Sequence, residues 1–377
     1  MSSTIRPSDS LPFKISDPER ISRRLEGIIF GVGQPLLDVV AKVTVEFLES
    51  FNLPDEEVHE LGDSEMGLVS LLFEVFNVEY LTGGSSQNSL IMSQWLLAVP
   101  KATTFAGCIG KDSIGDILTK TLTEAGINII LRVQDARETG LCIVFDSSRG
   151  RRMALRIGAI RNSIRTAFDQ PQHRALIHKA RCFYAEAYTL TYAIDAALEL
   201  ARYAAASDRH FCLNLSATHA SVRPAEGVAE LLPYVDVIFA GAMDVQAYAT
   251  MLGLSSEFDN SDACALGLSG WRKENGLKGR VVVVVRPTMD LVVVREGQLA
   301  TFPSMSPGLG NVVDDIGFGD AFAGAFMAVL VLGGSVDECL EAGVRAATFS
   351  LFERGCAPPK PIPSGARKLS RRESVTL

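Results

Sequence analysis

Short apolar runs rich in β-branched residues alternate with segments of helical periodicity along most of this chain. The pattern predicts strands at 27–32, 103–109, 182–185, 211–215 and 235–239, and helices at 89–99, 114–125, 193–206 and 319–332. Five consecutive valines at 281–285 predict a strand buried on both faces, with residues 291–294 as its partner. Such alternation favours an α/β fold: a doubly wound, mostly parallel sheet between two layers of helices.

Composition limits the classes of protein to which the chain can belong. It has 377 residues, of which 47% are hydrophobic and 21% charged, enough apolar content for a sizeable core and too much for a disordered chain. The net charge of −8 gives no basic field for nucleic acid. Apolar stretches such as 321–334 are shorter than the roughly 18 residues of a membrane span. Seven cysteines without a CxxC pair predict reduced thiols in the cytoplasm, and the histidines show no metal-ligand spacing.

The chain also divides into segments of different character. We expect a flexible extension at 1–26, a main domain at 27–359 and a basic flexible tail at 360–377. The tail is either a solvated segment or a phosphorylation site at Ser374, which follows Arg371 and Arg372. Residues 38–45 and 139–157 look β-like without an intervening long helix. We therefore expect segments at about 36–48 and 139–160 to form a small β-sheet lid over a site.

The strongest candidate for chemistry is the turn that leads into the apolar helix at 319–332. It reads Asp314-Asp-Ile-Gly-Phe-Gly-Asp320. Backbone N–H groups at a helix start have no partner within the helix, so Gly317, Phe318 and Gly319 are a candidate anion hole. Asp320 stands where a carboxylate could accept a proton from a substrate hydroxyl. The simpler interpretation is a turn glycine followed by a favourable first-turn acid.

Two further segments are candidates for ligand binding. In residues 82–89, Gly83 and Gly84 allow close backbone approach and Asn88 offers both a donor and an acceptor. In residues 33–38, Asp38 follows the first strand, where a carboxylate can hold paired sugar hydroxyls. The simpler interpretations are a loop with a helix cap and a turn aspartate.

Taken together, these motifs resemble the adenosine kinase branch of the ribokinase (PfkB) family, over roughly residues 31–359. The matching segments, in order, are 33–38, 83–89, 94–95, 107–112, 214–217, 233–236 and 317–320. The resemblance implies a ribokinase-like fold and transfer of the γ-phosphate of ATP to the 5′-hydroxyl of adenosine. It implies Mg²⁺ and ATP as cofactor and co-substrate, with the metal bridging the phosphates.

The same resemblance assigns roles to individual residues. Asp320 is expected to be the base, with the N–H groups of 317–319 holding the developing phosphate charge. The expected nucleoside-binding residues are Gln34, Asp38, Gly84, Asn88 and Tyr188, with Asp38 on the ribose hydroxyls and Tyr188 stacked on adenine.

The ATP side departs from the family pattern. Asp315, Ile316 and Phe318 replace a threonine, an asparagine and an alanine. A unit negative charge at ~5 Å from a phosphate and an effective dielectric of ~20 would oppose binding by roughly 3 kcal/mol.

Two more family segments are altered there. The family's Asn-x-x-Glu aligns with 241–244, so that Gly241 has no side chain and Asp244 would reach Mg²⁺ only through water. The nucleotide loop carries Arg286, a candidate phosphate ligand, and Pro287 in place of a glycine.

Three interpretations are open, because the motifs for the nucleoside are retained and those for ATP are altered. The first is an adenosine kinase with a divergent ATP site. The second is a catalytically inactive relative that binds a nucleoside, regulates another protein or takes part in an assembly. The third is a kinase for another nucleoside or a sugar. In each the small molecule is a nucleoside or a sugar, and a protein partner is expected only for the inactive form.

Overall fold

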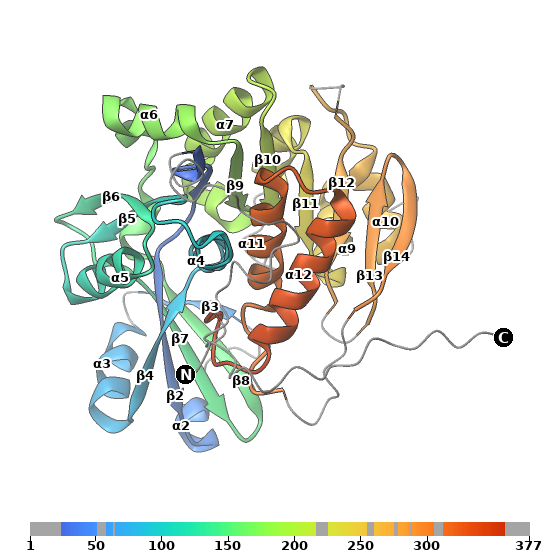
Figure 1. Cartoon of the computed structure of the whole chain (residues 1–377). Helices are drawn as coiled ribbons and strands as arrows, with labels where there is room; N and C mark the ends of the chain where they lie inside the picture. The colour runs from blue at the N-terminus through green and yellow to red at the C-terminus, as the bar shows by residue number, and fades with distance from the viewer. Residues whose placement is uncertain are drawn as a thin grey trace, which may run out of the picture.

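Two β-sheets of different size organise the molecule (Figure 1). The computed structural model describes residues 24–50, 58–62, 65–215, 225–254, 260–274, 278–286, 289–304 and 312–358. The tails expected at 1–26 and 360–377, with Ser374, lie outside these residues except for 24–26, as does Pro287. No helix in the described part of the chain is long and apolar enough to cross a bilayer.

Within the described residues, the larger sheet has nine strands in the order β14-β13-β12-β11-β10-β9-β1-β5-β6. Their bounds are β1 Ile29–Val32, β5 Thr103–Gly110, β6 Asn128–Gln134, β9 Cys182–Glu186, β10 His210–Asn214, β11 Val237–Ala240, β12 Val281–Val284, β13 Leu291–Arg295 and β14 Gln298–Phe302. All neighbours pair in parallel except β13, which is antiparallel to β12 and β14. The valine run thus forms a strand inside the sheet with 291–295 as its partner, as the sequence predicts, and the structure shows that this pairing is antiparallel.

Helices cover both faces of this sheet. The first core layer contains apolar side chains of α4 (Ser85–Leu97), α11 (Phe318–Val331) and α12 (Val336–Ser350). The second contains side chains of α7 (Leu190–Ala206), α8 (Ala225–Leu231), α9 (Ala242–Met251) and α10 (Ser261–Ser269), with α6 (Pro171–Lys179) beside them. Figure 1 shows α11 and α12 packed side by side in front of the sheet, with α4 next to α11. The three-layer doubly wound architecture is therefore confirmed.

The smaller sheet has the order β3-β8-β7-β2-β4. Its strands are β2 Leu36–Lys42, β3 Val58–Glu60, β4 Val78–Gly83, β7 Gly140–Ser147 and β8 Gly150–Arg156. One face packs on α2 (Val45–Ser50), α3 (Met66–Val75) and a side chain of α5 (Ser113–Glu124). The other face is apolar and contacts Tyr188 and Ile316 of the main body. Of the segments expected at 36–48 and 139–160, residues 36–42, 140–147 and 150–156 are strands of this sheet, whereas 45–48 belong to α2 and 158–160 to a 3-10 helix. The structure adds β3 and β4 to the sheet.

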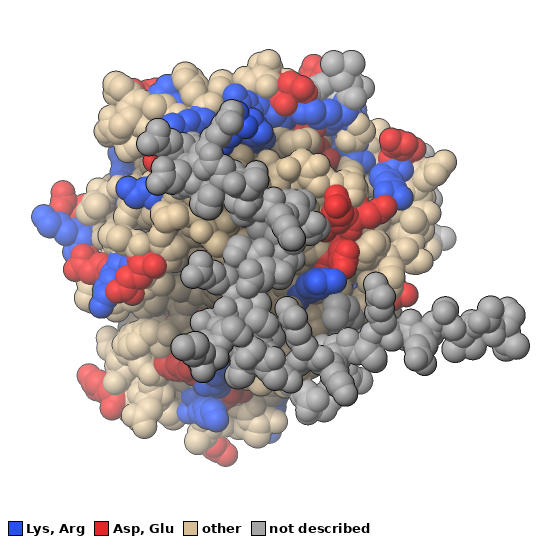
Figure 2. Space-filling model, in the orientation of Figure 1, with Lys and Arg blue, Asp and Glu red and all other residues tan. Residues whose placement is uncertain are grey.

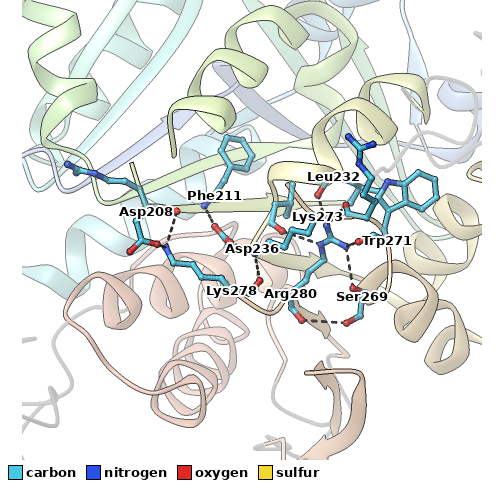
Figure 3. Close-up of polar contacts among 12 residues, drawn as sticks. Asp208, Phe211, Leu232, Asp236, Ser269, Trp271, Lys273, Lys278 and Arg280 are labelled. Carbon is cyan, nitrogen blue, oxygen red and sulfur yellow. Dashed lines mark hydrogen bonds and ion pairs between the residues drawn. The ribbon is translucent and has the colours of Figure 1, made fainter. Parts of the chain in front are cut away.

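A network of buried polar groups fixes the amino-terminal edge of the large sheet (Figure 3). Arg280, which precedes β12, is 3% exposed and donates to backbone carbonyls, among them those of Leu232 at 2.5 Å and Trp271 at 2.7 Å. Asp236, which precedes β11, accepts from Lys273 at 2.5 Å and from the backbone N–H of Phe211 at 2.9 Å. These side chains are saturated by protein partners, so the network stabilises the fold and leaves the opposite edge for ligands.

Candidate active site

A cavity of about 460 Å³ lies at the carboxyl-terminal edge of the large sheet, under the small sheet. In parallel α/β sheets ligands bind at this edge, where strands end and helices begin. The lining residues described are Leu36, Asp38, Gly84, Ser85, Asn88, Cys142, Met153, Leu155, Glu186, Tyr188, Asn214, Phe239, Ala240, Gly241, Asp244, Val285, Asp315, Ile316, Gly317, Phe318, Gly319 and Asp320. Three motifs far apart in sequence therefore meet at one cavity.

The amino terminus of α11 opens into this cavity. Gly317 is its N-cap, with φ of 79°, and a Cβ there would lie 2.3 Å from that of Cys356. Glycine is required on both counts, since an L side chain is strained at this φ and no space is left for one. A Cβ on Gly319, in contrast, would meet no atom within 4 Å. The backbone N–H of Gly319 has no acceptor among the described residues, whereas that of Phe318 donates to Asp315 O at 3.3 Å.

Phe318 is a core residue as well as a lining residue of the cavity. It is 6% exposed and belongs to the core layer formed with α4 and α12. A bulky residue at this position is accommodated because its side chain packs inward while its backbone remains at the helix start.

Asp320 faces the cavity and is held by α4. Its Oδ1 accepts from the Ser85 hydroxyl at 2.5 Å and its Oδ2 from the Asn88 amide at 3.2 Å. Burial raises the pKa of Asp320 to about 6, and the two hydrogen bonds oppose this rise. The carboxyl is thus fixed in orientation, mostly ionised at neutral pH and more basic than an exposed aspartate.

The start of α4 is built around two glycines. Gly84 has φ of 79°, and a Cβ there would lie 2.4 Å from the carbonyl oxygen of Gln34. A Cβ on Gly83 would lie 1.9 Å from Oδ1 of Asp38. Glycine at both positions lets the α4 turn approach the end of β1 and the carboxylate on β2.

Asp38 projects from β2 into the cavity beside Cys142, its register partner on β7. Burial raises the pKa of Asp38 to about 7, with the charge of Asp320 adding to the rise. The surrounding wall is apolar and includes Leu36 and Leu155. This part of the cavity can hold a planar apolar group next to a carboxylate that can accept hydrogen bonds from hydroxyl groups.

Of two further residues expected to bind the nucleoside, one lines the cavity and the other does not. Tyr188 lines the cavity, in the 3-10 turn Ala187–Thr189, and its ring packs edge-on against Tyr192 at 6.1 Å. Gln34 is buried and is not among the described residues that line the cavity. Its side-chain amide donates to the backbone carbonyl of Tyr188 at 3.4 Å. Gln34 therefore supports Tyr188.

The expected phosphate-side residues are engaged within the protein. Oδ2 of Asp244 accepts the backbone N–H of Gly241 at 3.2 Å and thereby caps α9, although Asp244 also lines the cavity. Arg286 pairs with Asp262 at 2.5 Å at the start of α10 and is not among the described lining residues. Asp315 is 71% exposed and lies 3.8 Å from Arg151 of β8.

Sequence analysis missed Glu186, the last residue of β9. It is 5% exposed and lines the cavity next to Asn214, its partner in the register of β10. With it the described lining contains five acidic residues and no basic one; these are Asp38, Glu186, Asp244, Asp315 and Asp320. The only sequence signal was an acid at the end of a buried strand, which many turns share.

The fold and the cavity are those of the carbohydrate kinase family. A model of the pfkB family carbohydrate kinases matches residues 61–363, and the chain belongs to this family. Within it, the chain is similar to adenosine kinases, which confirms the resemblance seen in the motifs. It is 31% identical to adenosine kinase 1 of Arabidopsis thaliana over 90% of this chain and 98% of that protein. It is 29% identical to adenosine kinase of Schizosaccharomyces pombe over 84% of this chain and 92% of that protein.

The fold agrees with solved structures. A crystal structure of Anopheles gambiae adenosine kinase, in complex with P1,P4-di(adenosine-5) tetraphosphate, superimposes with a TM-score of 0.82 at 28% identity. The match covers 89% of this chain and 99% of that one. The ribokinase-like fold expected from the sequence is thereby confirmed.

Proposed function

We propose that this chain is a nucleoside kinase that transfers the γ-phosphate of ATP to the 5′-hydroxyl of adenosine, giving AMP for purine salvage. One observation carries the proposal: the Asp320 carboxylate faces the same cavity as Asp38 and the N–H of Gly319, which has no acceptor in the part of the chain that the structure describes. A general base, a donor for developing phosphate charge and an acceptor for sugar hydroxyls are the parts that this reaction needs.

Each residue then has a defined task. Asp38 accepts hydrogen bonds from the ribose 2′- and 3′-hydroxyls. The base lies against the apolar wall and Tyr188. Asp320, oriented by Ser85 and Asn88, accepts the proton of the 5′-hydroxyl as that oxygen attacks, and the N–H of Gly319 donates to the phosphoryl oxygen that gains charge. The small sheet excludes water as a lid.

The structure offers a partial fit for ATP and Mg²⁺. The open space at Gly319 suits a terminal phosphate, and Asp244 would hold the metal through water, since Mg²⁺ commonly uses one or two carboxylates with phosphates and water. When bound, the metal neutralises phosphate charge, which a cavity lined by five acids makes necessary. The side chains that could bind the phosphates directly are few, because Arg286 is paired elsewhere.

Adenosine-dependent release of ADP from Mg-ATP, measured in a coupled assay, tests the proposal. We expect Asp320→Asn to reduce kcat about 10²- to 10⁴-fold. The control is Asp337→Asn, an exposed acid on α12 paired with Arg295 at 2.9 Å, which should leave kcat unchanged. Turnover of the unaltered protein no higher than that of Asp320→Asn would overturn the assignment.

A second candidate is an inactive nucleoside binder, favoured by the internal pairing of Arg286 and the acidic cavity lining. Thermal shift separates the two. Ligand at 100-fold excess over its Kd stabilises the folded state by about 2.7 kcal/mol. A shift with adenosine and none with Mg-ATP supports the binder, and shifts with both support the kinase.

A further inference from the structure

The side chain of Asp314, in the turn before Gly317, connects three segments of the chain. It is buried, and its Oδ1 accepts from the backbone N–H of Ile316 at 3.1 Å and from Nη1 of Arg151 at 2.6 Å. Its Oδ2 accepts from the backbone N–H of Gly355 at 3.0 Å. One carboxylate therefore holds the turn at the start of α11, the loop after α12 and strand β8 of the small sheet.

Strand β8 approaches this turn with one of its faces. Successive side chains of a strand point to opposite faces, so Arg151, Met153 and Leu155 share a face. Met153 and Leu155 line the cavity. Leu155 also belongs to an apolar cluster against which Met153 and Ile316 pack. The face of β8 that covers the cavity is thus the same face that, through Arg151, holds Asp314.

The loop after α12 provides a second connection between the small sheet and the turn. Arg354 pairs with Glu79 of β4, and the N–H of Gly355 donates to the buried carboxylate. Cys356 lies so close to Gly317 that no Cβ would fit between them. A movement of the small sheet therefore acts on the turn through two connections, and the buried carboxylate takes part in both.

The ion pair of Arg151 differs from its neighbours in burial. The side chain of Asp314 is 4% exposed and that of Arg151 is 30% exposed. Arg149, on the same hairpin, pairs with Glu49 at 2.7 Å, but these side chains are 67% and 61% exposed. Solvent screens an exposed pair, whereas a charge-assisted hydrogen bond to a buried carboxylate retains its strength. Loss of Arg151 should therefore affect the turn, and loss of Arg149 should not.

We propose that Asp314, paired with Arg151, is a positioning residue that couples the small sheet to the turn presenting Gly319, so that a nucleoside bound under the sheet increases the affinity for ATP. This rests on the proposed function, in which the sheet covers the nucleoside and the N–H of Gly319 binds the terminal phosphate. Neither Asp314 nor Arg151 is among the described residues that line the cavity. Both act through the turn, and by linkage ATP increases the affinity for the nucleoside by the same factor.

Calorimetric titration with adenosine, with and without Mg²⁺ and a non-hydrolysable ATP analogue, measures this coupling. We expect the analogue to tighten adenosine binding about tenfold in the unaltered protein and less than about twofold in Arg151→Met, which keeps the aliphatic part of the side chain. Arg149→Met is the matched control and should keep the full factor. Absence of coupling in the unaltered protein, or a factor that Arg151→Met leaves unchanged, overturns the proposal.

A double-mutant cycle shows whether Arg151 acts through Asp314. In an Asp314→Asn background, Arg151→Met should have no further effect on the affinity for the ATP analogue. An equal loss of affinity in both backgrounds would mean that the guanidinium contacts the phosphates itself, and it would overturn the role of Asp314.

A third measurement needs neither ligand nor an Asp314 variant. Hydrogen exchange of the Ile316 and Gly355 amides, which donate to Asp314, should be about tenfold faster in Arg151→Met and unchanged in Arg149→Met. Unchanged exchange in Arg151→Met overturns this inference, even if the protein is an active kinase. Faster exchange in a protein that binds neither adenosine nor the ATP analogue supports the connection of sheet and turn and overturns the kinase assignment alone.

Discussion

Ser85 Oγ lies 2.5 Å from Oδ1 of Asp320, although 235 positions separate the two residues in the chain. The contact joins the first residue of α4 to the first turn of α11, and these two helices pack in the same layer on one face of the large sheet. Because both helix starts contain a glycine with positive φ, Gly84 and Gly317, the backbone can bring the two side chains together. The orientation of the proposed base thus depends on helix packing.

The two glycines at the start of α11 should respond differently to alanine. Gly317→Ala combines a positive φ with a Cβ 2.3 Å from that of Cys356, and should destabilise the protein by more than about 1 kcal/mol. Gly319→Ala has open space, so we expect it to fold with unchanged stability while the methyl group weakens ATP binding about tenfold. Urea unfolding and the KM for ATP measure the two effects. Equal loss of stability in both variants would contradict the assignment of Gly319 to the cavity.

Activity should have an acid limb set by Asp320. Its pKa of about 6 means that the base gains a proton, and kcat/KM falls, as pH decreases through 6. Its stability contribution has the opposite trend, because a raised carboxyl pKa favours the folded state at low pH and loses that effect as pH rises through about 6. A pH series of initial rates from 5 to 8 checks the first point, and constant kcat/KM down to pH 5 would refute it.

The charge of Asp315 should weaken ATP binding less than its position in the sequence suggests. The side chain is 71% exposed and lies 3.8 Å from Arg151, so solvent and a cation both screen it. We expect Asp315→Asn to lower the KM for ATP by less than about fivefold, well short of the two decades that a roughly 3 kcal/mol repulsion would give. Asp337→Asn is the control. A 100-fold decrease in the KM for ATP in Asp315→Asn would show that the carboxylate acts directly on the phosphates.

Phe318 should contribute mainly to stability. Its ring is 6% exposed within the core layer between α11 and its neighbours. Phe318→Ala should cost about 3–5 kcal/mol in unfolding free energy, as large-to-small core changes do, and Phe318→Leu much less. Denaturant unfolding of both variants checks this. Improved ATP binding by a fully stable Phe318→Ala would instead mean that the ring crowds the phosphate site.

Replacing Arg280 should lower the stability of the protein without changing ligand binding in the cavity. Its guanidinium donates to several backbone carbonyls, including that of the buried Leu268 at 2.9 Å. Arg280→Met removes all of these charge-assisted hydrogen bonds, and we expect a loss of about 3–5 kcal/mol with unchanged KM values in the folded fraction. Arg295→Met, at an exposed arginine, is the control. Equal stability of the two variants would contradict a structural role for the network.

Much of the fold follows from local patterns. The alternation of strands and helices, the valine strand and the helix of Asp320 are short-range features, so the sequence predicts them correctly. The start of α4 was placed four residues late, at Ser89, because the glycines before it look like loop and the polar first turn gives no apolar periodicity.

The site was less predictable where it depends on tertiary contacts. Asp38, Gly84, Asn88 and Asp320 lie on motifs, and the structure brings them to one cavity as expected. The sequence does not show which candidate side chains form ion pairs away from the cavity, as Arg286 does with Asp262. Such pairs depend on neighbours that only the tertiary structure brings together. The catalytic and binding roles themselves stay predictions for the experiments above.

Charge on the visible surface is mixed. Figure 2 shows lysine and arginine side chains interspersed with acids over the described part of that face, in keeping with the overall negative balance of the composition. Acidic residues without a basic neighbour are found instead among the described residues that line the cavity.

The hydrogen bonds of Arg280 and Asp236 at the amino-terminal edge of the sheet also affect how the sheet can move. Strands β10, β11 and β12 are anchored there by groups that can neither stretch nor slide without losing hydrogen bonds. We therefore expect any movement on ligand binding to occur at the far end of those strands and in the five-stranded sheet, and not at this edge.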